Sequence, residues 1–180
     1  AACSGAAISL NSGHYAVGCT TAGTTNAEAN YYGSSVRITA ASAGAGNDAI
    51  RAASLVSLSA VSAAERSWPI ALASTTTLGQ NADPAISYVG IRYDTGAGDT
   101  QWMCCSNDGS GAGTCNALGA RTASVTATRF EVWYVEGNAT CRIVNGITGA
   151  LLATETHATN VPATSTALNV WTSATTLQNV

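Results

Sequence analysis

Two glutamates in one short segment are the strongest candidates for catalysis in this chain. Glu131 and Glu136 bound the sequence Glu-Val-Trp-Tyr-Val-Glu, and glycoside hydrolysis requires two carboxylates, one on each side of the scissile bond. The segment reads as a β-strand, in which residues five positions apart face opposite ways, so the carboxylates could converge only through a bulge. The only histidines, His14 and His157, do not suggest a catalytic triad. We therefore favour an ordinary strand with solvated Glu side chains, and we expect no catalytic residues and no enzyme activity.

Three aspartates could hold a metal ion. Asp94, Asp99 and Asp108 fall in consecutive Gly-rich loops, and hard oxygen ligands gathered at one end of a sandwich could bind Ca²⁺. Their spacing matches no calcium-loop template, and Asp residues that accept hydrogen bonds from their own turn are the commoner explanation. A structural calcium ion is the one cofactor that the sequence leaves open, and otherwise we expect none.

Four aromatic side chains could supply a platform on which sugar rings stack. They are Trp102, Trp133, Tyr134 and Trp171. The chain has only one Phe, so these large rings are also needed to fill a core. Contact with glycans and burial in the core both remain open for them.

The six cysteines form an even set without zinc-type spacing, since the chain contains no C-x-x-C pair. They are Cys3, Cys19, Cys104, Cys105, Cys115 and Cys141. Adjacent side chains in a strand point to opposite faces, so Cys104 and Cys105 more easily serve two different partners than one another. We predict a Cys3–Cys19 bridge, a bridge from one of the adjacent pair to Cys115, and a bridge from the other to Cys141. Such bridges imply an oxidising setting outside the cell or on a released particle; buried thiols in a cytosolic protein are the alternative.

The chain carries little charge. Only 9% of its 180 residues are charged, none is Lys, and the formal net charge is −3. No polybasic patch is present for a nucleic acid, and the longest apolar stretch, 49–64, contains Arg51 and four Ser residues, so it cannot span a membrane. Weak repulsion between like charges favours close packing into an assembly. We therefore expect copies of the chain, or other surface proteins, as partners.

Short apolar runs, bounded by Gly, Asn or Asp, recur along most of the chain. Turn signals spaced by about 8–12 residues are typical of a β-sandwich or barrel. The strands predicted are 35–39, 70–74, 85–93, 101–105, 124–127, 129–135, 140–144, 151–157 and 167–171. The Ala-rich segment 49–64 could be helical, but Ile50, Val56 and Leu58 share a face at even spacing, so we favour a strand pair or one long buried strand. We expect an irregular, disulfide-stapled N-terminal arm over 1–34 and one all-β domain over 35–180.

The order of several segments resembles a known family. The matching segments are Tyr88-Val89-Gly90-Ile91-Arg92-Tyr93, Gly98-Asp99-Thr100-Gln101-Trp102, Arg129-Phe130-Glu131-Val132, Arg142-Ile143-Val144-Asn145-Gly146 and Thr159-Asn160-Val161-Pro162. In this order they resemble the concanavalin-like, laminin-G-like jelly-roll domains of tailed-bacteriophage virion proteins. The resemblance implies a two-sheet antiparallel β-sandwich of jelly-roll type. The six Cys, the lack of Lys and the early C-terminus depart from the family's pattern, and they leave open whether a last strand is absent, cleaved or donated by a neighbour.

The resemblance also implies a function. Members of that family are virion structural parts, such as capsid decoration proteins, fibres and tail-associated modules. Together with the weakly charged surface, it favours a non-enzymatic virion structural protein, located on a virion surface or outside the cell. The alternative is a carbohydrate-binding module of a secreted or receptor-binding protein, which predicts an exposed Trp or Tyr over a shallow groove.

Overall fold

Antiparallel pairing joins the neighbouring strands of this protein. A computed structural model describes residues 7–11, 14–18, 28–32, 38–39, 50–58, 64–75, 83–121, 124–135, 137–163 and 166–176. The strands are β1 (Ala7–Asn11), β2 (His14–Gly18), β3 (Glu28–Tyr32), β4 (Ile38–Thr39), β5 (Ile50–Leu58), β6 (Glu65–Ala73), β7 (Ser87–Asp94), β8 (Trp102–Asp108), β9 (Thr114–Gly119), β10 (Ser124–Val135), β11 (Asn138–Asn145), β12 (Leu151–His157) and β13 (Ala167–Thr176). A short 3-10 helix, η2 (Thr95–Ala97), follows β7. The all-β prediction is confirmed.

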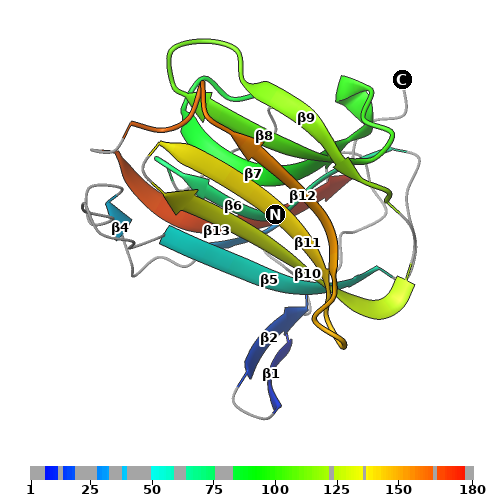
Figure 1. The fold of residues 1–180 in the computed structure, drawn as a ribbon. Coiled ribbons are helices and arrows are strands. Elements are labelled where there is room, and N and C mark those ends of the chain that lie inside the picture. Colours follow the sequence, from blue (N-terminus) through cyan, green and yellow to red (C-terminus); the bar gives the residue numbers. More distant parts are fainter. Residues whose placement is uncertain are drawn as a thin grey trace.

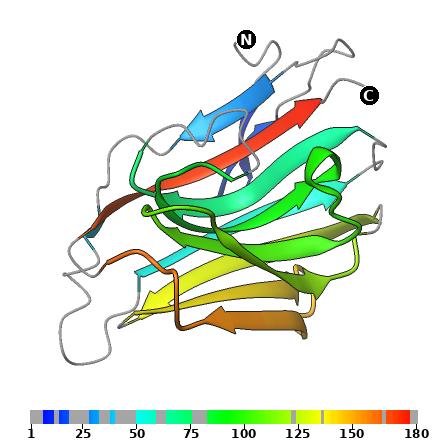
Figure 2. The same ribbon diagram turned by 90° about the horizontal axis from the view of Figure 1, so that it is seen from above.

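Two stacked sheets form the sandwich (Figures 1 and 2). The four-stranded sheet has the order β12-β11-β10-β5, and the large sheet has the order β3-β13-β6-β7-β8-β9, with β4 also pairing β13. The chain passes between the sheets from β4 to β5, from β5 to β6, from β9 to β10 and from β12 to β13. β1 and β2 pair with each other in a separate hairpin. The predicted two-sheet antiparallel sandwich is therefore confirmed.

The space between the sheets is filled by every second residue of the facing strands. Val89 and Ile91 of β7 point into this core from the large sheet, and Phe130 and Val132 of β10 point into it from the four-stranded sheet. The ring centroids of Trp102 and Phe130 lie 4.8 Å apart across the core. Burial of each large apolar side chain stabilises the fold by roughly 1.5–3 kcal/mol. The period-two alternation of the sequence is thus what stacks the two sheets.

A second apolar cluster lies on the opposite face of the large sheet. Trp68 of β6, Tyr88 of β7 and Trp171 of β13 are buried there, and the centroid of Trp68 lies 5.5 Å from that of Tyr88 and 6.3 Å from that of Trp171. Gly90 makes room for this packing, because a Cβ at that position would lie 2.7 Å from the Ala71 Cβ and 3.1 Å from the Trp68 ring. The central strands of the large sheet are therefore buried on both faces.

Some strands differ in extent from the prediction. The strand expected over 70–74 begins at Glu65 and includes Pro69. Pro69 lies at a register shift between Ser67 and Ile70, where the strand does not need the backbone N–H that proline lacks. The sequence pattern does not predict β9, because Leu118 is its only buried side chain and the apolar alternation is missing. Its strand pairing with β8 decides its conformation.

The structure also shows the conformation of part of the segment 49–64 and of part of the N-terminal arm. The described part of the ambiguous segment 49–64 includes β5, a strand over Ile50–Leu58, so the strand interpretation is confirmed there. The predicted arm over 1–34 contains β3, which pairs with β13 of the large sheet, so part of that arm extends the sandwich. Among the described residues no helix is long and apolar enough to cross a membrane.

Candidate binding surface

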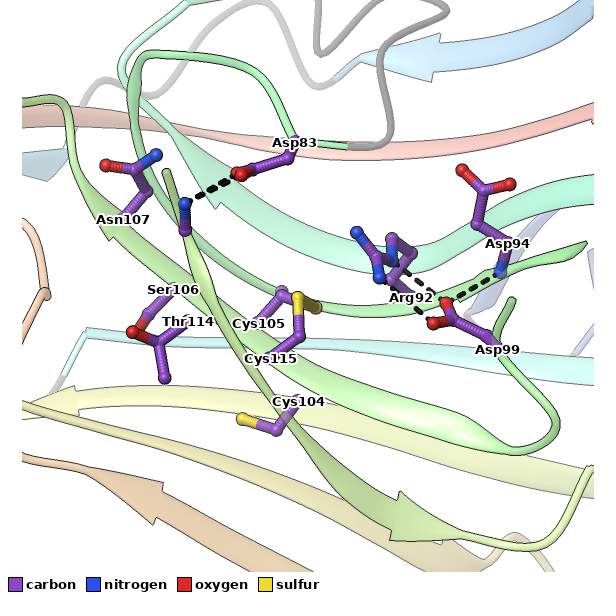
Figure 3. Close-up of a disulfide and its surroundings, with 12 residues drawn as sticks. Asp83, Arg92, Asp94, Asp99, Cys104, Cys105, Ser106, Asn107, Thr114 and Cys115 are labelled. Carbon is purple, nitrogen blue, oxygen red and sulfur yellow. Dashed lines mark hydrogen bonds and ion pairs between the residues drawn. A yellow bond between two sulfur atoms is a disulfide. The ribbon is translucent and has the colours of Figure 1, made fainter. Parts of the chain in front are cut away.

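Two adjacent cysteines of β8 form disulfides with different strands. Cys104 is bonded to Cys141 of β11 and so joins the two sheets through the core, while Cys105 is bonded to Cys115, which lies directly opposite on β9. Figure 3 shows the Cys105–Cys115 bond and the Cys104 side chain pointing away from it. This confirms that the adjacent cysteines serve different partners because they face opposite sides of a strand. The predicted Cys3–Cys19 bridge lies outside the described residues.

The three predicted calcium ligands do not share one site. Asp94 accepts hydrogen bonds from the backbone N–H groups of the 3-10 helix that follows it and pairs with Arg66. Asp99 forms a two-pronged ion pair with Arg92, 3.0 Å at each oxygen, which Figure 3 shows. Asp108 lies at the other end of the β7–β8 hairpin, where it accepts hydrogen bonds from Ser110. These carboxylates bind guanidinium and backbone groups, and no group of three His, Cys, Asp or Glu among the described residues could hold a metal ion.

Most of the aromatic rings predicted to contact glycans lie in the interior. Trp102 and Tyr134 are buried between the sheets, where the Tyr134 hydroxyl donates to the Pro162 carbonyl oxygen at 2.5 Å. Trp171 is buried on the opposite face of the large sheet. Of the two alternatives left open by the sequence, burial in the core therefore holds for these three rings, as the scarcity of other aromatic residues suggested. Only Trp133 is partly exposed.

Glu131 is not the solvated side chain that we expected. It lies on the outer face of the four-stranded sheet, 8% exposed, with its carboxylate 2.7 Å from the Arg129 guanidinium and 3.3 Å from that of Arg142. Its cross-strand partner is Arg142, so the two opposite charges are placed side by side by the register. Glu136, the other half of the hypothetical catalytic pair, lies outside the described residues.

A serine–histidine pair that the sequence does not reveal connects the two sheets. The Ser106 Oγ of β8 lies 2.7 Å from the His157 Nδ1 of β12. A serine beside a histidine can act as a nucleophile in an open site, but both of these side chains are buried, so a substrate could not reach the hydroxyl. Burial lowers the pKa of His157, and the nearby Glu155 opposes that shift. The pair is a structural contact between residues 51 positions apart, for which the sequence carries no local signal.

The outer face of the four-stranded sheet collects side chains into three rows. The alternate residues of β10 point into the core, so the following rows point outward: Arg51, Trp133, Thr140 and Thr156; then Ala53, Glu131, Arg142 and Thr154; then Leu55, Arg129, Val144 and Leu151. Residues paired across antiparallel strands lie on one face with Cβ atoms about 5 Å apart. This face therefore carries an end with Arg51, Trp133 and two Thr residues, a charged middle, and an end where exposed Leu side chains lie on either side of Arg129 and Val144.

The first of these ends is organised around Trp133. The guanidinium carbon of Arg51, from β5, lies 4.3 Å from the centroid of the Trp133 ring, and that of Arg142, from β11, lies 4.4 Å from it. One cation comes from each strand that neighbours β10. We call these three residues the Arg–Trp–Arg stack. Its indole ring is covered by cations and is not an open stacking platform for a neutral sugar.

The end with the exposed Leu side chains continues onto the adjacent turn. Leu55, Leu151, Leu152 and Ile147 are 63%, 50%, 60% and 76% exposed. Ile147 follows Gly146, where an added Cβ would lie 2.4 Å from the Ala127 carbonyl oxygen and 2.7 Å from the Leu55 side chain, so the β11–β12 turn lies beside β10 and close to the end of the Leu55 side chain. We call these four residues the apolar corner. Large apolar side chains that are exposed singly are common, but four of them at one end of a sheet make that end a candidate interaction surface.

Comparisons with known proteins do not assign this chain to a family. No protein-family model matches the sequence, and no curated protein matches it significantly. Among solved structures, a crystal structure of Scytalido-glutamic peptidase with a peptide-based transition-state analogue matches with a TM-score of 0.37 and 11% sequence identity. The match covers 70% of this chain and 57% of the peptidase chain. The resemblance to virion jelly-roll domains remains a prediction.

Proposed function

We propose that this chain is a non-enzymatic structural protein of a virion surface or a similar extracellular particle, and that it associates with copies of itself through the apolar corner. The observation that carries the proposal is the exposure of four large apolar side chains at one end of the four-stranded sheet, Leu55, Ile147, Leu151 and Leu152, each at least half exposed. Removing apolar surface from water is the main favourable term in protein association. Four such side chains in one place are costly for an isolated molecule and useful for one that is packed against a neighbour.

Two further features support the proposal. The disulfides between Cys104 and Cys141 and between Cys105 and Cys115 fit an oxidising setting outside the cell. The low content of charged residues, 9%, keeps repulsion between neighbouring copies weak. The virion itself is inferred from the resemblance of the segments between Tyr88 and Pro162 to phage jelly-roll domains.

Sedimentation velocity over a range of concentrations tests this function. We expect the wild-type chain to form dimers or larger species and the Leu55→Asp/Leu151→Asp variant to be monomeric. Because each buried leucine contributes roughly 1.5–3 kcal/mol, the double substitution should weaken association by about 100-fold or more. Both side chains are largely exposed, so the fold should survive, which circular dichroism would check.

The matched control is Thr100→Asp. Thr100 is exposed in the loop between η2 and β8 of the large sheet, so the variant adds negative charge away from the apolar corner and should associate like the wild type. A wild-type chain that stays monomeric at high concentration would contradict the proposal. If the wild-type chain does associate, electron microscopy will show whether the associated material forms particles or filaments.

A further inference from the structure

The Arg–Trp–Arg stack lies on the same sheet face as the apolar corner but at its other end. Arg51 and Leu55 are four residues apart on β5, a separation of about 13 Å along a strand. The stack is therefore a different site from the proposed assembly contact. We propose that it binds the carboxylate or sulfate groups of an acidic polysaccharide.

The geometry of the stack prepares both guanidinium groups to bind an anion. Arg51 and Arg142 lie over the Trp133 ring with their central carbons 4.3 and 4.4 Å from its centroid. A guanidinium that stacks on a ring uses its flat face and keeps the N–H groups at its edge available to donate. The ring also restricts the rotamers of both side chains, so less conformational entropy is lost when a ligand binds.

The charges on this face favour an anionic ligand. In the part of this face that the structure describes, three guanidinium groups and one carboxylate give a formal charge of +2, although the chain as a whole has a net charge of −3. Glu131 is shared by Arg129 and Arg142, whereas Arg51 has no carboxylate partner among the residues described. A second copy docked face to face would bring arginines against arginines, which is repulsive. The occupant of this end of the face must therefore supply negative charge.

The shape of the surface favours an extended polysaccharide chain over a compact anion. Arg51 and Arg142 come from β5 and β11, the two strands that flank β10, so a chain with repeated anionic groups can contact a cation on each of these strands. Thr140 and Thr156, paired with each other beside Trp133, add hydroxyl groups within 2.9 Å of one another. Hydroxyls can both donate to and accept from sugar hydroxyls.

Binding to immobilised polysaccharides tests the inference. The probes are polygalacturonate, which carries carboxylates, dextran sulfate, which carries sulfates, uncharged dextran, and poly-glutamate, an acidic polypeptide. We expect the wild-type protein to bind one or both acidic polymers, to ignore dextran and to bind more weakly as salt is raised. Arg51→Gln should weaken binding by about tenfold, the factor for one charge-assisted hydrogen bond. Arg51→Lys keeps the positive charge but not the planar guanidinium, so its binding should be weaker than that of the wild type and stronger than that of Arg51→Gln.

Thr100→Asp is again the matched control, because it lowers the net charge by one unit as Arg51→Gln does but lies in the loop before β8, away from the four-stranded sheet. An equal loss of binding in both variants would overturn the site and leave only a net-charge effect. Binding to dextran as tight as to the acidic polymers would overturn the role of charge, and tighter binding to poly-glutamate would replace the polysaccharide by an acidic polypeptide. No binding to either acidic polymer would refute the inference while leaving the assembly proposal, which sedimentation tests, unaffected.

Discussion

Removing the disulfide that joins the two sheets should cost more stability than removing the one within the large sheet. The variants are Cys104→Ala/Cys141→Ala and Cys105→Ala/Cys115→Ala. The bonded residues are 37 positions apart in the first case and 10 in the second. Because a disulfide restricts the unfolded chain more when it closes a longer loop, loop-closure entropy alone predicts losses of about 4 and about 3 kcal/mol.

Packing should widen this difference. Cys104 and Cys141 are completely buried between the sheets, so replacing both sulfur atoms leaves a cavity in the core, and a cavity of methyl size costs about 1 kcal/mol. Cys115 is partly exposed, so water and neighbouring side chains can fill the space that it leaves. We therefore expect the variant without the inter-sheet bond to be the less stable one by about 1–2 kcal/mol.

Equilibrium unfolding in urea, followed by the fluorescence of the buried tryptophans, measures both losses. The slope of the unfolding free energy with urea should also rise in each variant, because an unfolded chain without a cross-link exposes more surface. Mass measurement before and after reduction should first show that each variant keeps the other of these two disulfides. Equal losses, or a larger loss for the variant without the bond between β8 and β9, would refute this reasoning.

Two other substitutions test buried polar groups. Thermal unfolding should occur at a lower temperature at pH 5.5 than at pH 7.5, because burial lowers the pKa of His157 in the folded state. The stability that neutral His157 contributes is complete above the unfolded-state pKa of about 6.5 and is lost as the pH falls through the folded-state pKa. His157→Gln should reduce this pH dependence of the unfolding temperature, and an unchanged dependence would exclude His157 as its cause. Asp99→Asn should reduce the stability by about 3 kcal/mol, because it removes the carboxylate charge that the buried Arg92 guanidinium binds with two hydrogen bonds, and the loss should be the same with and without a chelator. Stabilisation of the wild-type chain by added Ca²⁺ would instead support the calcium hypothesis.

Local patterns in the sequence account for the strands that have one apolar face. The alternation around Phe130 and Val132 is visible in one dimension, because side chains of a strand alternate between two faces whatever the strand pairs with. The same rule separates Cys104 from Cys105 and so predicts that they have different partners. The alternation does not predict β9, because this strand has only one buried side chain.

The candidate sites could be predicted only in part. Trp133 was one of four candidate aromatic residues, and nothing local distinguishes it from Tyr134, its neighbour, which points into the core. Arg51 and Arg142 are far from Trp133 in the sequence, and they meet it only because β5 and β11 pair on either side of β10. The Asp residues show the opposite error: their loops are close in sequence, yet the hairpin sends Asp94 and Asp108 to opposite ends.

By itself the sequence determined that the chain folds as a β-sandwich, because the two-residue period of apolar side chains and the turn residues between the runs act within a few neighbouring positions. It also determined the low charge of the surface. Only the tertiary structure decided which side chains are outside and which of them meet, as in the Arg–Trp–Arg stack and the apolar corner. The physical reason is that the order and register of the strands depend on contacts between segments that are distant in the sequence. Exchanging two neighbouring strands would give every side chain of a strand new partners, and shifting the register by one residue would move every side chain to the other face of the sheet.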